Sequence, residues 1–172
     1  MAVSRPAAAP AAAPLRELLA RSAEGDTDSF ARLYDLTVKR VYGLVLRRLC
    51  DRADAERVTQ HVYVTLWRQA GALLAKDCHP LAGIISLAHH EVVQFRSRSG
   101  PGATAERADL GEMVQRSTMA LSRTQQEILT LVYLGGYTPR QVADLLQLER
   151  MTVSTALSTG LRRLTPDVTV PS

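Results

Sequence analysis

Cysteine and aromatic residues are scarce in this chain of 172 residues, which has two cysteines, one tryptophan and two phenylalanines. Cys50 and Cys78 form neither a C-x-x-C motif nor part of a zinc site with the usual ligand spacing. We therefore expect two buried free thiols. No apolar run approaches the roughly 20 residues that a membrane span requires, so we expect no transmembrane segment.

Motifs of the common catalytic sites are also missing. The four histidines form no H-E-x-x-H arrangement, which would place two metal ligands and a base on one helical face. The sequence also contains no G-x-S-x-G nucleophile elbow, no G-x-x-x-x-G-K-[ST] phosphate loop and no G-x-G-x-x-G dinucleotide fingerprint. We therefore predict no enzyme activity, no metal site and no cofactor.

The charge is mildly basic and unevenly distributed. The formal net charge is +4 and the isoelectric point is about 9.4, which is compatible with nucleic-acid binding but not specific for it. Residues 1–99 hold 14 basic and 10 acidic side chains, against 7 and 7 in the rest. Residues 1–14 are rich in alanine and proline, and their prolines interrupt any signal-peptide core. This segment is predicted to be a disordered lead of a cytoplasmic protein.

Apolar residues recur every three or four positions in three segments of the first half, which predicts three amphipathic helices. The first begins near Asp28, with N-cap candidates at Asp26 and Ser29 as well. The second begins near Asp54. The third follows a break that ends at Pro80, because proline suits a first helical turn. We expect these helices to pack as a small bundle.

Residues 97–105 read SRSGPGATA and show no apolar periodicity, which predicts a flexible interdomain linker. Beyond it, a helical segment is expected around residues 113–121. A second helix starts at the capping box of Ser122 and Gln125 and ends at the glycine pair 135–136.

A second capping box, Thr138 with Gln141, starts a short helix that a polar turn at residues 147–150 separates from a longer one, Met151 to Leu164. The longer helix is amphipathic and presents small polar residues and arginine outward. Two helices joined in this way match a helix-turn-helix, whose second helix reads DNA. Periodicity alone does not distinguish this arrangement from any other three-helix bundle.

The residues themselves resemble a known family. The stretches FARLY (30–34), VYGL (41–44), DAERVTQ (54–60) and LWRQA (66–70) resemble region two of bacterial RNA polymerase sigma factors of the extracytoplasmic-function (ECF) group. The stretches LSRTQQEIL (121–129), YLGGYT (133–138), VADLL (142–146) and GLRRL (160–164) are similar to region four of the same group. Both modules occur in the expected order, with the predicted linker between them.

The resemblance implies an all-α transcription initiation factor with two small helical domains. It assigns residues 1–14 to the lead, 15–98 to a region-two-like bundle, 99–109 to the linker, 110–166 to a region-four-like helix-turn-helix domain and 167–172 to a tail. The implied partners are core RNA polymerase and promoter DNA, with an anti-sigma factor as a further candidate. No membrane association is implied.

The resemblance also assigns three sets of site residues. Polymerase binding would fall to the exposed side of the second helix: Asp54, Arg57, Gln60 and His61. Promoter melting would fall to the third helix: His90, Gln94, Phe95, Arg96 and Arg98. DNA recognition would fall to the helix-turn-helix: Thr138, Arg140, Gln141, Arg150, Thr152, Ser154, Thr155, Ser158, Arg162 and Arg163.

Several of these positions depart from the family pattern. Arg57 and His61 stand where the family usually has acidic residues that help to hold the polymerase, and Ser154 and Ala156 stand where it has lysine and arginine. Glu91 is expected to repel the phosphate backbone. Phe95 could stack on an unpaired base or belong to the core.

Two functions fit this pattern. One is a divergent sigma factor that initiates transcription. The alternative is a degenerate sigma-like regulatory protein that keeps the fold but binds a protein partner.

Overall fold

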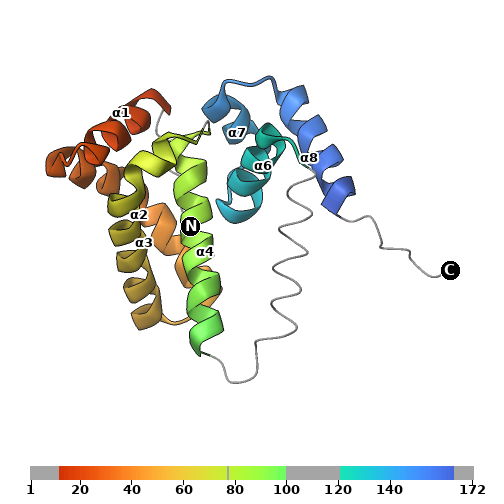
Figure 1. The fold of residues 1–172 in the computed structure, drawn as a ribbon. Coiled ribbons are helices and arrows are strands. Elements are labelled where there is room, and N and C mark those ends of the chain that lie inside the picture. The colour runs from red at the N-terminus through yellow and green to blue at the C-terminus, as the bar shows by residue number, and fades with distance from the viewer. Residues whose placement is uncertain (1–11, 77, 100–120, 165–172) are drawn as a thin grey trace, which may run out of the picture.

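The structure is a computed structural model that describes residues 12–76, 78–99 and 121–164, and its regular elements in these ranges are all helical (Figure 1). The all-α fold class predicted from the sequence is confirmed. Four helices precede residue 100: α1 (Ala12–Ala23), α2 (Thr27–Leu49), α3 (Arg52–Leu74) and α4 (Pro80–Ser99). The rest follow residue 120: α6 (Arg123–Leu129), the π-helical segment η1 (Thr130–Leu134), α7 (Pro139–Leu146) and α8 (Arg150–Leu164).

Helix α1 was not predicted from the sequence. It begins at Ala12, inside the segment 1–14 that we expected to be a disordered lead, so that prediction is wrong for residues 12–14. Alanine is the strongest helix former, and Pro14 lies in the first turn, where its missing N–H costs nothing. Leu15 and Leu19 are fully buried on one face of α1 and anchor it to the bundle.

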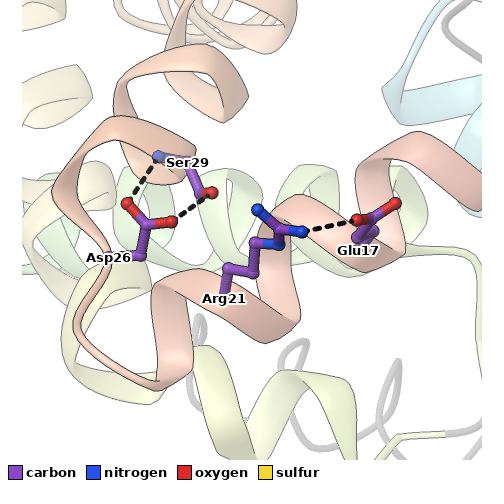
Figure 2. A network of polar contacts seen from close by, with 4 residues as sticks. All are labelled: Glu17, Arg21, Asp26 and Ser29. Carbon is purple, nitrogen blue, oxygen red and sulfur yellow. Dashed lines mark hydrogen bonds and ion pairs between the residues drawn. The ribbon is translucent and has the colours of Figure 1, made fainter.

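The turn between α1 and α2 is fixed by side-chain hydrogen bonds, which Figure 2 shows. The Asp26 carboxylate caps α2 by accepting hydrogen bonds from the backbone N–H groups of Asp28 and Ser29, at 3.0 and 3.1 Å. It also accepts one from the Ser29 hydroxyl at 2.8 Å. These hydrogen bonds lower the pKa of Asp26, and the bond from the Ser29 hydroxyl has the largest effect. One turn earlier, Arg21 pairs with Glu17 at 3.2 Å on the exposed side of α1.

Helices α1 to α4 contact one another around a shared apolar core. The predicted helical periodicity is confirmed, since Leu33, Val45, Val62 and Leu66 are all fully buried. A polar contact joins two helices within this core: the Thr37 and Tyr63 hydroxyls are 2.8 Å apart, and Thr37 also donates to a backbone carbonyl of its own helix. Burial raises the pKa of the Tyr63 hydroxyl, so this group stays a neutral hydrogen-bond partner.

The second set of helices begins at the Ser122 capping box, which the structure contains as predicted. The helix expected to run from there to the glycine pair is instead divided, because after Leu129 the backbone widens into the π-helical segment η1. Its end is marked by a hydrogen bond from the Gly135 N–H to the Thr130 carbonyl, five residues back, at 2.9 Å. The linker prediction is wrong at residues 97–99, which form the last residues of α4, and the rest of the predicted linker lies outside the described residues. The helix predicted around residues 113–121 also lies outside them, apart from Leu121, which is not helical.

The two thiols are not buried as expected. Cys50 is exposed, because it ends α2 in a left-handed conformation at the surface. Cys78 is half-buried in the turn before α4, where burial and the nearby Glu127 carboxylate raise the pKa of its thiol.

Candidate nucleic-acid and polymerase interface

Helices α7 and α8 form the helix-turn-helix that the sequence predicts. The Thr138 hydroxyl accepts a hydrogen bond from the Gln141 backbone N–H at 3.3 Å, and the Gln141 side chain accepts one from the Thr138 backbone N–H at 3.0 Å. Helix α7 ends at Leu146, and the left-handed conformation of its C-cap residue Gln147 (φ 53°) turns the chain toward α8. Val153 is fully buried and fixes the rotation of α8 about its axis.

That rotation presents a row of polar side chains on the outer face of α8. Each of the following is exposed: Arg150, Thr152, Ser154, Thr155, Ser158 and Arg162. Ser154, which stands where the family pattern has lysine, is therefore directed outward. Ala156 is half-buried and packs against the core, so this position does not lie on the outer face. The side chain of Arg163 lies outside the described set.

The three DNA-binding residues predicted at the start of α7 differ in whether their polar atoms are engaged within the chain. Arg140 is exposed in the first turn, where it can reach a phosphate. Thr138 and Gln141 are engaged with each other by the capping box, so their oxygen atoms hold the start of the helix. Their first role is therefore to position α7 and, through the turn, α8.

The predicted polymerase surface lies on the outer face of α3, near its start. Arg57 pairs with Asp54 one turn earlier at 3.7 Å, and both side chains remain open to solvent, with 70% and 36% of their surfaces exposed. Gln60 is exposed. His61 is 55% exposed, and its Nε2 atom lies 3.3 Å from a carboxylate oxygen of Glu91 on α4. Each divergent residue thus lies beside a carboxylate.

Glu91 does not point outward as the sequence suggested. Its side chain is only 11% exposed and is directed at α3, where it contacts His61 and the Thr65 hydroxyl, the latter at 3.5 Å. Its expected repulsion of a phosphate backbone is therefore weakened by burial and by a partner on α3. Sequence spacing could not show this contact, because the two residues belong to different helices.

The predicted promoter-melting residues occupy the carboxyl-terminal half of α4. His90, Arg96 and Arg98 are exposed, and Gln94 is half-buried. Phe95 is half-buried and packs against the core, so the structure favours the core interpretation for most of its ring. The basic charge of this stretch comes from the two arginines in its last turn.

Two features of this interface were missed by sequence reasoning. Met151 is 75% exposed at the start of α8, beside the polar row. Val64 on α3 and Val93 on α4 are also large apolar side chains left exposed on the helices that carry His61 and Glu91. The sequence contained a signal for the exposure of Met151, because this residue lies outside the apolar stripe of α8, on the same side as Thr152 and Thr155.

Comparisons with known proteins identify the family of this chain. The family described as Sigma-70, region 4, matches residues 111–164, which include every predicted DNA-binding residue. The chain is 34% identical over 168 residues to the ECF RNA polymerase sigma factor SigK of Mycobacterium sp. (strain JLS), covering 86% of both chains. It is 33% identical over 170 residues to SigK of Mycobacterium ulcerans (strain Agy99), covering 87% of this chain and 91% of the relative.

The chain belongs to the ECF sigma factors.

Solved structures give weaker similarity to this sigma factor. CnrH in complex with the cytosolic domain of CnrY is 18% identical, with a TM-score of 0.45, over 89% of this chain and 96% of that one. The RsbN–BldN complex is 24% identical, with a TM-score of 0.41, over 86% and 97%.

Two further observations concern the rest of this sigma factor. A cleft of about 470 Å³ lies between α1 and α2, lined in part by Leu18, Arg32 and Leu36, and none of the predicted site residues borders it. Within the described ranges, no helix combines the length and apolar character needed to cross a membrane.

Proposed function

We propose that this sigma factor binds core RNA polymerase and directs initiation at promoters whose upstream element is read by α8. The observation that carries the proposal is the row of exposed polar residues on α8, held outward by buried Val153 and by the capped α7. Hydroxyl groups can hydrogen-bond base edges or phosphates, and arginine binds phosphate or guanine. The chain acts by binding in the cytoplasm, and we propose no catalysis and no cofactor.

Within this row, we assign phosphate contacts to Arg150 and Arg162, which stand near the two ends of the described helix. Base and phosphate contacts fall to Thr152, Ser154, Thr155 and Ser158. Ser158 donates a hydrogen bond to the Ser154 backbone carbonyl at 3.0 Å, so its oxygen atom remains an acceptor. Arg140 and Arg163 are assigned to the same function from the sequence.

We assign promoter melting to the carboxyl-terminal half of α4. Its exposed side chains combine a histidine and two arginines, which suit the backbone of a separated strand. Because Phe95 packs against the core, stacking on a base would use only its exposed edge.

We assign polymerase binding to the outer face of α3, including Asp54, Arg57, Gln60 and His61. This surface mixes both charge signs, since Asp54 lies beside Arg57 and Glu91 lies beside His61. An anti-sigma factor is a further candidate partner, proposed from membership of the family alone.

The test is transcription by purified core polymerase with the full chain on a library of genomic promoter fragments. We expect discrete start sites that depend on the chain. The double variant Arg150→Ala/Arg162→Ala should lose most of this transcription. Lys39→Ala removes an exposed cation of α2 outside the assigned site residues, and this control should leave transcription intact.

A second function is favoured by one observation, the basic side chain of Arg57 on the polymerase surface. A sigma-like regulatory protein would bind a protein partner and give no start sites. A titration of core polymerase separates the two functions, run with the natural chain and with Arg57→Asp. Binding by both chains supports initiation, whereas binding by the variant alone supports the regulatory function.

A further inference from the structure

The helices before residue 100 and those after residue 120 contact each other directly, chiefly through α4 and η1 (Figure 1). The apolar part of this contact is close. Ile85 and Leu131 are both fully buried, and residues of both sets belong to one continuous core. A Cβ atom added at Gly135 would lie 2.8 Å from the Ile85 Cδ1 atom and 2.6 Å from the Leu131 carbonyl oxygen. Only glycine permits this approach.

A cation and an aromatic ring join α2 to the turn after η1. The guanidinium carbon of Arg40 lies 3.8 Å from the centroid of the Tyr137 ring. Tyr137 is only 2% exposed, so water is largely excluded from the ring, and cation–π attraction is stronger in such a site than at an open surface.

A carboxylate joins α6 to the start of α4. Glu127 accepts a hydrogen bond from the backbone N–H of His79, the residue that precedes α4. The His79 Nδ1 atom in turn accepts a hydrogen bond from the Leu81 backbone N–H at 3.2 Å. A negative charge is stabilised at a helix N-terminus, because unpaired N–H groups and the helix dipole meet there.

The same contact contains groups that favour its separation. The Tyr137 hydroxyl and the His79 Nε2 atom are buried and have no hydrogen-bond partner among the described residues. A buried polar atom without a partner regains hydrogen bonds to water when its site opens. Favourable contacts are therefore opposed by unfavourable ones at the same place, which reduces the free-energy difference between the contacting and the separated arrangement.

We propose that Arg40, His79 and Ile85 on one side, with Glu127, Gly135 and Tyr137 on the other, form a releasable clasp that holds this chain in a closed state. In the open state α4 and α8 move independently, whereas in the closed state they move as one body. The clasp goes beyond the proposed function, because neither polymerase nor DNA takes part in it.

The test measures the distance between the two helical sets in the full chain by single-molecule fluorescence energy transfer. Cys78→Ser provides the background, and dyes are attached to exposed Cys50 and to Ser158→Cys on α8. We expect one dominant population with high transfer. The double variant Arg40→Met/Glu127→Gln should raise the ratio of open to closed chains at least about fivefold, because it removes both charged contacts.

Two further variants separate the clasp from a general effect of charge. Lys39→Met/Glu149→Gln removes the same two charges at exposed positions outside the clasp, and it should leave the ratio unchanged. Tyr137→Phe keeps the ring under Arg40 and removes the unpaired hydroxyl, so it should lower the ratio. Circular dichroism checks that each variant keeps its helices; if the double variant unfolds, Arg40→Met alone and Tyr137→Phe decide. Equal effects of the clasp and control variants, or opening by Tyr137→Phe, would overturn the proposal.

Discussion

The Nε2 atom of His61 lies 3.3 Å from a carboxylate oxygen of Glu91, and this contact joins α3 to α4 at the proposed polymerase surface. The two partners differ in exposure, at 55% for the His61 side chain and 11% for Glu91. An acidic residue at position 61, as in the family pattern, would therefore face a nearly buried carboxylate. The charge that position 61 can carry is therefore coupled to the carboxylate of Glu91.

We predict that His61→Glu destabilises the fold. Two carboxylates would lie near 4 Å, where like charges repel by between about 1 and 4 kcal/mol, depending on the local dielectric constant. Arg57→Asp should cost less, about 0.2–0.5 kcal/mol, because Asp54 and position 57 are exposed neighbours on one helix. Urea unfolding followed by circular dichroism measures both effects.

The matched controls are His61→Gln and Arg57→Gln, which remove the natural partner without adding a negative charge. His61→Glu should be less stable than His61→Gln at pH 7, and the difference should shrink in acid as the carboxylates become protonated. Equal stability of the two variants would show that Glu91 is not directed at position 61.

We predict that Ser154→Lys strengthens DNA binding without changing stability. Ser154 is exposed on the outer face of α8, so a lysine there reaches solvent and phosphate. One added phosphate contact should steepen the dependence of log K on log salt by about 0.9. Fluorescence anisotropy with promoter duplex at several salt concentrations measures this slope. Ala156→Arg is the contrasting variant, because a half-buried position cannot take the guanidinium without loss of stability.

We predict that Arg150→Ala and Arg162→Ala each weaken binding to all duplexes to a similar extent. Both side chains are exposed and stand near the ends of α8, where phosphate contact is expected. Each loss should flatten the salt slope by about one unit. If a variant instead changes the preferred DNA sequence and leaves the salt slope unchanged, the arginine that it lacks contacts a base rather than a phosphate.

Helices α2, α3, α4, α7 and α8 were predictable because each leaves a local signal in its own residues, whereas α1 and the π-helical segment η1 were not predicted. The capping boxes at Ser122 and Thr138 and the periodic burial of α2 and α3 follow from residues within one element. Contacts between elements left no such signal. Glu91 turns toward His61, and Tyr137 lies under Arg40, because tertiary packing brings distant segments together. Ala156 stands where the resemblance places an arginine, and nothing in the sequence indicated that the rotation set by Val153 makes this position half-buried.

We predict that the stability of the chain falls between pH 6.5 and 4 because of His79. Burial lowers the pKa of this imidazole from 6.5 to about 4, and its Nδ1 atom accepts a hydrogen bond from the Leu81 N–H, which protonation would break. In this window the unfolded chain binds a proton that the folded chain does not, so stability rises with pH. The effect is up to about 3 kcal/mol.

The comparison that isolates this group is His79→Asn, since asparagine can also cap α4 but does not titrate. Carboxylates and His89, whose pKa burial also lowers, contribute to the pH dependence of both chains. The difference in unfolding free energy between the natural chain and the variant should therefore carry the His79 contribution alone. This difference should be constant above pH 7. As the pH falls to 4, the natural chain should lose stability relative to the variant. A difference that does not change with pH would show that His79 is protonated equally in the folded and unfolded chain.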